Sequence, residues 1–393
     1  MKKIMQMIAC TLVFSFCLGS LGSLGSIAHA QGISLDAKAS LLMEAETGKI
    51  LHEHNPHEKL APASVTKVMT MLLIYEALDQ EKIKWDDVVT TSAHAASMGG
   101  SQIFLEVGEQ QTVRDLTKAI VIASANDAAV AMAEFISGSE DAFVSAMNKK
   151  AADLGMVNTN FANACGLDAP GHLTTAHDIA LMSRELILKY PDVFKYATTR
   201  LDKIVHKTAR GEEEFGLTNT NKLIRNYTGA TGLKTGSTSE ALYCISATAE
   251  KEGMQLISVI LGSPNPGVRF DNAMKLLDFG YANFALIAKE EAGTEMGTVH
   301  ISKGSIENSP VVIKEQTNMV APKGKHVELN GEVVITEGLT APVQAGQPVG
   351  EVIYTWEGEE VGRSQLIVPD DVPRASANVM IDRIFRRWFF VAG

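Results

Sequence analysis

Apolar and polar residues alternate with different periods along the chain, and these periods predict its secondary structure. Residues 39–55 hold two β-rich runs separated by Glu46-Thr47-Gly48, which is typical of a hairpin. Residues 232–262 predict adjacent antiparallel strands with a turn at 250–253. Apolar residues at helical spacing predict helices at 61–78, 112–136, 174–190 and 269–284.

The order of these elements predicts two folded domains. Strands at both ends and helices between them favour an α+β domain whose first and last strands share a sheet. After residue 293 the pattern changes to short alternating strands with Gly, Pro and Asn turns, which predicts a small all-β domain. We place the boundaries at 1–30 for an export signal, 31–288 for the α+β domain, 289–372 for the all-β domain and 373–393 for a terminal helix.

The first thirty residues have the pattern of a secretory signal peptide. Lys2 and Lys3 precede a long apolar run, and the small residues Ala28 and Ala30 are placed for cleavage after Ala30. An uncleaved membrane anchor is the alternative. In either case we expect the rest of the chain to be exported.

The C-terminal residues 378–391 predict an amphipathic helix. The stretch is too short and too charged to span a bilayer, but a basic helix with aromatic residues suits a membrane surface. The alternative is a terminal helix that packs on its own protein. One face would carry Met380, Ile381, Ile384, Phe385, Trp388 and Val391, and the other Asp382, Arg383 and Arg386, with Arg387 at the flank.

Charge and cysteine content exclude some classes of protein. A formal net charge of -11 argues against nucleic acid as a partner, because phosphate binding normally needs a basic excess. Cys165 and Cys244 are the cysteines beyond the export signal, and we expect them to be buried and unpaired rather than part of a disulfide scaffold. His52, His54 and His57 suggest a metal site, but Pro56 breaks any helix that would align them, so we expect a solvated loop.

Ser64 and Lys67 stand at the start of the apolar run 61–78, three residues apart. Side chains at this spacing share a helix face. A serine hydroxyl needs a base beside it to become a good nucleophile, and a lysine in apolar surroundings loses proton affinity because desolvation penalises its charged form. The pair therefore predicts a nucleophile and its base, although a capping serine with a solvent-directed lysine has the same spacing.

Ser124 and Asn126, in the sequence "SAND", interrupt a second apolar run. We expect Ser124 to pass a proton between the nucleophile and the leaving group. Asn126 is expected to hold Lys67 and an amide of the substrate. The alternative is a helix N-cap, which is a common role for both residue types.

The sequence "KTGST" at 234–238 enters a predicted strand. Lys234 and Thr235 offer a cation and a hydroxyl for a carboxylate. Gly236 leaves room for the close approach of another backbone, and an edge strand here would pair with an extended peptide. The backbone N–H of Ser237 is expected to form an oxyanion hole with that of Ser64.

In this order, the S-x-x-K, S-x-N and K-T-G patterns resemble those of penicillin-binding proteins and serine β-lactamases. The chain is more closely similar to the low-molecular-weight penicillin-binding proteins that are D-alanyl-D-alanine carboxypeptidases, serine peptidase family S11, which has sporulation-associated members. The resemblance covers nearly the whole chain and is carried by "LAPASVTKVMT", "SANDAAVAMAE", "DAPGHLTTAHDIALMSREL" and "TGLKTGST".

The resemblance implies a penicillin-binding, β-lactamase-like transpeptidase fold and a two-step acyl transfer without metal or cofactor. Ser64 would attack the bond between the terminal D-alanines of a peptidoglycan stem peptide, and water would hydrolyse the acyl-enzyme. β-Lactams would acylate the same serine. With the export signal, this implies a protein on the outer face of the cytoplasmic membrane, attached through residues 378–391.

Other functions remain open at this point. A serine β-lactamase is the nearest alternative, but the E-x-x-L-N pattern of class A enzymes is absent between Asn126 and Lys234. A DD-endopeptidase or a transpeptidase would use the same acyl-enzyme chemistry. A non-catalytic wall-binding protein is disfavoured because all motif residues are intact.

Overall fold

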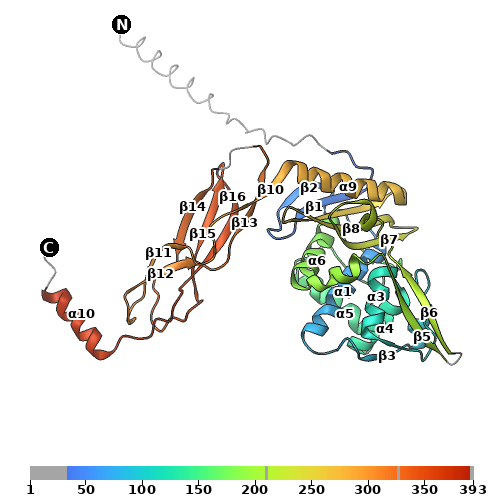
Figure 1. Ribbon diagram of the computed structural model, residues 1–393, viewed down its shortest axis with the longest axis horizontal. Coiled ribbons are helices and arrows are strands. Elements are labelled where there is room, and N and C mark those ends of the chain that lie inside the picture. Colours follow the sequence, from blue (N-terminus) through green and yellow to red (C-terminus); the bar gives the residue numbers. More distant parts are fainter. Residues whose placement is uncertain (1–32, 209–210, 325–327, 390–393) are drawn as a thin grey trace, which may run out of the picture. The chain divides into compact units, whose positions relative to one another are not determined.

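A computed structural model of the protein describes residues 33–208, 211–324 and 328–389 (Figure 1). The export signal predicted at residues 1–30 and the terminal Val391 lie outside these residues.

A five-stranded antiparallel sheet forms the centre of the first domain. The first strand in sequence, β1, pairs with the last, β9, which confirms that the first and last strands share a sheet. The strand with the sequence "KTGST" is β7, at one edge. In spatial order the strands are β2 (Ile50–His54), β1 (Ala39–Glu44), β9 (Met254–Ser263), β8 (Leu242–Lys251) and β7 (Ala230–Thr238).

Helices cover both faces of this sheet, so its strands are buried on each side (Figure 1). Val259 belongs to the large core that includes the helical part, whereas the adjacent Ile260 packs with Phe270 on the other face. This follows from the alternation of side chains along a strand. The long helices are α1 (Lys67–Asp79), α4 (Asn126–Ser137), α5 (Glu140–Asp153), α6 (Ala176–Lys189) and α9 (Pro266–Asn283).

The helix predicted at 112–136 is interrupted. It begins as α3 (Val113–Lys118), widens into a π-helical turn at Ala119–Ala123, and stops at Ser124, whose φ is +64°. The left-handed backbone at Ser124 ends the turn, and α4 begins two residues later. The prediction of one continuous helix was therefore wrong, because the apolar spacing continues across a break in the backbone.

A hairpin that the sequence patterns did not predict projects from the helical part. Its strands, β5 (Leu201–Thr208) and β6 (Gly211–Thr218), pair only with each other. The remaining short elements are two 3₁₀ turns at Ala63–Thr66 and Pro191–Val193, β3 (Val88–Thr90), α2 (Ala93–Ala96), β4 (Gln110–Thr112), α7 (Phe194–Ala197) and α8 (Leu223–Asn226).

Two minor predictions meet different outcomes. Cys165 and Cys244 are buried and unpaired, as expected. The solvated loop expected for the histidines was wrong for His52 and His54, because both lie on β2. Within the described part of the chain, no three or more His, Cys, Asp or Glu residues are grouped to hold a metal ion.

The C-terminal part of the chain is an all-β domain, as predicted. Its five-stranded sheet has the order β11-β12-β16-β15-β14, and Val311, Val352 and Leu366 lie in its core. A separate pair joins β10 to β13. The strands are β10 (Phe284–Ala288), β11 (Glu295–His300), β12 (Asn308–Ile313), β13 (Asn318–Pro322), β14 (Asn330–Ile335), β15 (Pro348–Trp356) and β16 (Glu359–Ile367).

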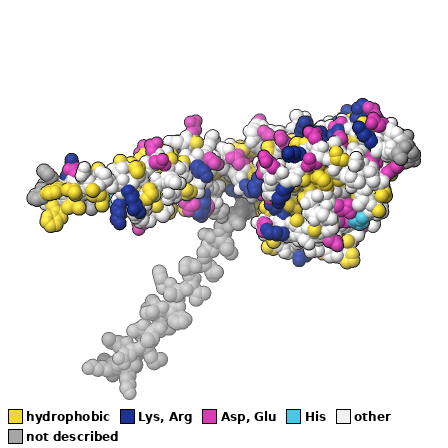
Figure 2. Space-filling view, turned by 90° about the horizontal axis from the view of Figure 1, so that it is seen from below, with side chains coloured by type: hydrophobic (Ala, Val, Ile, Leu, Met, Phe, Trp, Pro, Cys, Tyr) yellow, Lys and Arg dark blue, Asp and Glu magenta, His cyan; other side chains and the backbone are white. Residues whose placement is uncertain are grey.

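The terminal helix α10 spans Ala377–Phe389. Apolar side chains gather on it in the space-filling view (Figure 2). Among the described residues, no helix combines the length and the apolar character that crossing a bilayer requires.

Gly280 tests how tightly α9 packs on the sheet. A Cβ atom there would lie 2.5 Å from Leu256 Cδ1 and 2.9 Å from Leu42 Cδ2. We expect Gly280→Val to lower the free energy of unfolding by about 2–3 kcal/mol, because the added methyl groups force the core to rearrange. Urea unfolding followed by circular dichroism measures this change.

The matched control is Lys275→Val on the exposed side of the same helix, where only helix propensity changes, by about 0.5 kcal/mol. Equal destabilisation by the two variants would contradict the packing argument.

Candidate active site

The predicted nucleophile and base lie side by side. Ser64 is in the 3₁₀ turn Ala63–Thr66, and Lys67 is the first residue of α1. The Lys67 Nζ atom is 3.1 Å from Ser64 Oγ. The turn and the helix that follows it place both side chains on one face, as the spacing predicted.

Lys67 is completely buried and contacts no carboxylate. Besides Ser64, its ammonium group donates to Asn126 Oδ1 at 2.6 Å and to the carbonyl oxygen of Cys165 at 2.7 Å. Burial lowers the pKa of Lys67 to about 8, although Cys165 and Asp127 act to raise it. A neutral amine that can accept the Ser64 proton is therefore accessible near neutral pH.

Asn126 connects α4 to the loop that precedes the interrupted helix. Its side-chain amide donates to the carbonyl of Gly99 at 2.7 Å, and its backbone N–H donates to the carbonyl of Ser101 at 2.7 Å. The buried carboxylate of Asp127 holds the next part of the same loop, because it accepts the backbone N–H groups of Ile103 and Leu105. The S-x-N segment and this loop therefore form one connected unit.

Lys234 on β7 reaches across to the S-x-N segment. Its Nζ atom donates to Ser124 Oγ at 2.8 Å and to the carbonyl of Thr235 at 2.9 Å. The side chain is almost completely buried, and burial, followed by the charges of Lys67 and Arg269, lowers its pKa well below the usual range. The site therefore holds two buried amines in a region that favours a negative charge.

Gly236 allows β7 to lie against the nucleophile. A Cβ atom at this position would lie 2.8 Å from the backbone nitrogen of Ser64 and 2.9 Å from that of Val65. Ser237, the next residue, is exposed on the edge strand. The strand edge, where a peptide substrate would pair, therefore begins beside the Ser64 backbone.

Three segments that are distant in the sequence are thus brought together. The site residues form one series: Lys67 contacts Ser64 and Asn126, Lys234 contacts Ser124 two residues before Asn126 in the same segment, and Gly236 abuts the Ser64 backbone. The hydroxyl of Thr235 lies beside this series and donates to Thr220 Oγ1 at 2.8 Å.

Several supporting residues were missed by the sequence analysis. Arg269 lies behind β7 and donates to the carbonyl oxygens of Gly236 and Cys244. Asn163 accepts the backbone N–H groups of Cys165 and Gly166, and so shapes the loop whose carbonyl contacts Lys67. No short pattern surrounds Arg269 or Asn163. Asp127 had a signal, because it is a charged residue within an apolar run.

This combination defines a class of protein. A serine with a buried lysine as its base, beside an edge strand of an antiparallel sheet, is the arrangement of the penicillin-binding serine acyl-transfer enzymes. The D-alanyl-D-alanine carboxypeptidase family model matches residues 26–265, and the model of the penicillin-binding protein 5 C-terminal domain matches residues 285–374. The chain belongs to the D-alanyl-D-alanine carboxypeptidase family of serine peptidases.

Curated relatives share most of their length with this chain. The D-alanyl-D-alanine carboxypeptidase DacF of Bacillus subtilis is 43% identical over 354 residues, which cover 90% of each protein. DacC of Escherichia coli is 36% identical and aligned over 86% of this chain and 85% of its own. Among solved structures, penicillin-binding protein 5 of Haemophilus influenzae has a TM-score of 0.76 at 33% identity, over 87% of this chain and 99% of its own.

The pH dependence of acylation tests the state of Lys67. Because the base must be unprotonated to accept the Ser64 proton, we expect kcat/KM for acylation to rise with pH through a midpoint of about 8 and to level off above it. Stopped-flow measurement of acylation by a chromogenic β-lactam gives the profile. A rate that is flat between about pH 6 and pH 9 would contradict the role of a buried amine as base.

Proposed function

We propose that this protein removes the C-terminal D-alanine from peptidoglycan stem peptides that end in D-Ala-D-Ala, through an acyl-enzyme on Ser64. The observation that carries the proposal is the contact between Ser64 Oγ and the fully buried Lys67 amine, at 3.1 Å. The names of the relatives support the substrate, since those described above are D-alanyl-D-alanine carboxypeptidases.

In the acylation step, neutral Lys67 takes the Ser64 proton as Oγ attacks the carbonyl carbon of the penultimate D-alanine. The oxyanion that forms is stabilised by the backbone N–H groups of Ser64 and Ser237. Collapse of this intermediate breaks the peptide bond, and the leaving amine takes up a proton delivered through Lys67 and Ser124. Asn126, which contacts Lys67, orients the base.

The terminal carboxylate of the substrate is recognised by Lys234 and the Thr235 hydroxyl. A carboxylate placed here gives the buried Lys234 amine a negatively charged partner, and so favours the protonated form of Lys234. Binding of the anion and charging of Lys234 therefore stabilise each other. This explains a preference for peptides with a free C-terminus.

In the second step, water attacks the ester carbonyl and Ser64 leaves as the free hydroxyl. The released stem peptide is shorter by one D-alanine. β-Lactams present a comparable carbonyl and carboxylate, so they acylate Ser64 in the same way. The absence of the class A pattern E-x-x-L-N between Asn126 and Lys234 favours a peptidase over a class A β-lactamase.

We further propose that α10 attaches the exported protein to the membrane surface. Ile381, Ile384, Phe385 and Trp388 are exposed, Trp388 by 83%, which suits insertion of an apolar face among lipid headgroups. Arg383 has a different role from the apolar residues of this helix. Arg383 donates to the carbonyl oxygens of Gly304 and Ser305 in the all-β domain, so it orients the helix instead of meeting lipid.

Substitution of the nucleophile tests the catalytic proposal. We expect Ser64→Ala to reduce D-alanine release from a stem pentapeptide by at least about 10⁴-fold and to abolish covalent labelling by penicillin, because no acyl-enzyme can form. Mass spectrometry of the peptide products and of the intact protein measures both effects.

The matched control is Ser237→Ala, which keeps the nucleophile and the backbone N–H and should still be labelled. Labelling of the Ser64→Ala protein would refute the nucleophile. Wild-type protein that is labelled by penicillin but releases no D-alanine would refute the proposed substrate.

Removal of the terminal helix tests the attachment. Residues 31–393, and the same chain ending at Arg374, are mixed with vesicles that contain anionic lipid and sedimented. We expect the full chain to bind and the shortened chain to remain in solution, because the exposed apolar face is lost.

The double variant Ile381→Ser/Trp388→Ser distinguishes loss of the apolar face from loss of the whole helix, because it keeps Arg383 and its contacts. Vesicle binding by the shortened chain would contradict the proposal.

A further inference from the structure

The hairpin β5–β6 leads directly to Thr220, which contacts the K-T-G segment. The chain leaves β6 at Thr218 and reaches Thr220 two residues later. Thr220 Oγ1 accepts the hydrogen bond from Thr235, and the Thr220 backbone N–H donates to the carbonyl of Ile122 at 3.2 Å. The position of this hairpin therefore affects a residue that contacts the K-T-G segment.

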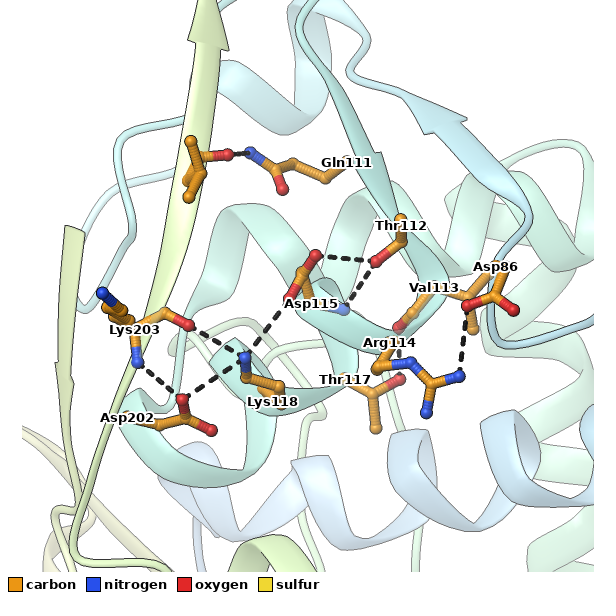
Figure 3. Close-up of polar contacts among 11 residues, drawn as sticks. Asp86, Gln111, Thr112, Val113, Arg114, Asp115, Thr117, Lys118, Asp202 and Lys203 are labelled. Atoms are coloured by element: carbon orange, nitrogen blue, oxygen red, sulfur yellow. Dashed lines mark hydrogen bonds and ion pairs between the residues drawn. The ribbon is translucent and has the colours of Figure 1, made fainter. Parts of the chain in front are cut away.

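A two-stranded hairpin has little stability of its own and needs contacts with the rest of the protein. Because β5 and β6 pair only with each other, these contacts must come from side chains. Figure 3 shows polar contacts to β5 from Lys118 on helix α3 and from Gln111 on strand β4.

Lys118 makes the central contact. Its Nζ atom donates to the carbonyl oxygen of Lys203 on β5 at 2.8 Å and to Asp115 Oδ1 on its own helix at 3.3 Å. It also lies 3.4 Å from Asp202 Oδ1 on β5 (Figure 3). The Lys118 side chain is only 14% exposed. A largely buried cation held by two carboxylates and a carbonyl has a fixed geometry, unlike a lysine at the surface.

Lys118 is also the last residue of α3, directly before the π-helical turn that ends at Ser124. The Lys118 ammonium therefore joins the hairpin that leads to Thr220 with the helical segment that leads to Ser124. Both segments reach the site proposed for the substrate carboxylate. Ser124 Oγ accepts a hydrogen bond from the Lys234 amine, and Thr220 accepts one from Thr235.

A second contact lies further along the same strand. Gln111 donates through Nε2 to the carbonyl of Val205 on β5 and to Glu109 Oε1, both at 2.8 Å. The same carboxylate oxygen is 2.6 Å from His206 Nδ1. Glu109 and Gln111 are buried, so these groups have no water to replace a lost partner.

We propose that Lys118 is a positioning residue for recognition of the substrate's terminal carboxylate. It holds the β5–β6 hairpin against the segment that ends at Ser124, and so keeps Thr220, Thr235 and Lys234 in fixed relative positions. The inference rests on the proposed function, because it assigns Lys234 and Thr235 to the carboxylate. Lys118 itself does not touch the substrate.

The test compares ligands with and without the free carboxylate. Acylation of Ser64 by benzylpenicillin and by its methyl ester is measured for the wild type and for Lys118→Met. We expect the variant to lower the acid-to-ester ratio of second-order rate constants about tenfold, while the ester rate stays within about twofold of wild type. A purely structural defect would slow both ligands equally, and that result would overturn the proposal, as would an unchanged ratio.

Arg114→Gln is the matched control. Arg114 is also an ion-paired cation on α3, but it contacts the exposed Asp86 and not the hairpin (Figure 3). We expect it to keep the wild-type ratio, and Lys118→Arg to restore most of it, since guanidinium can reach the same oxygens. A reduced ratio in Arg114→Gln equal to that in Lys118→Met would also overturn the proposal.

Gln111→Leu provides an independent variant if Lys118→Met does not fold, as judged by its melting temperature. It releases the Val205 carbonyl at the other end of the contact, so the ratio should fall in the same direction, and an unchanged ratio counts against the inference. The penicillin assay does not depend on D-alanine release. Absence of that release in the wild type would refute the proposed substrate, while the acid-to-ester ratio still decides the role of Lys118.

Discussion

The structure depends on keeping the amine of Lys67 out of water. A buried ammonium is expensive unless it is paired, so the surroundings decide whether the amine stays charged or gives up its proton. Here every oxygen that it contacts is neutral: the hydroxyl of Ser64, the amide of Asn126 and the carbonyl of Cys165. These acceptors satisfy the hydrogen bonds of the amine without fixing its charge, which is what a base that acts near neutral pH requires.

The three acceptors come from distant parts of the chain, so the Lys67 amine is correctly placed only when the whole domain is folded. The same holds for Lys234, which lies on the edge strand and contacts Ser124. Neither amine contacts a carboxylate, and Arg269 stands behind β7. The site therefore has an excess of potential positive charge inside the protein. An anionic substrate and the oxyanion of the reaction are the groups that this charge distribution stabilises.

The sequence predicted the parts of this site that depend on local spacing. Ser64 and Lys67 share a turn, and the K-T-G segment lies on an edge strand, as their patterns indicated. The break at Ser124 was not predictable from apolar periodicity, because the apolar residues continue on both sides of it. The β5–β6 hairpin was missed since most of its residues are not buried, and of its strand residues only Ile204 and Leu217 are. Arg269 and Asn163 act on backbone atoms brought close by folding, which leaves no local pattern.

Comparison of Lys67 with Lys118 shows how one type of side chain serves two purposes in the same domain. Both are largely buried, and both join segments that are far apart in the sequence. Lys118 lies between the carboxylates of Asp115 and Asp202, which pair with its ammonium group and fix its position. Lys67 has neutral partners only, so burial shifts it toward the free amine. The charge of the contacting oxygens thus distinguishes the lysine proposed to position the hairpin from the lysine proposed to act as the base.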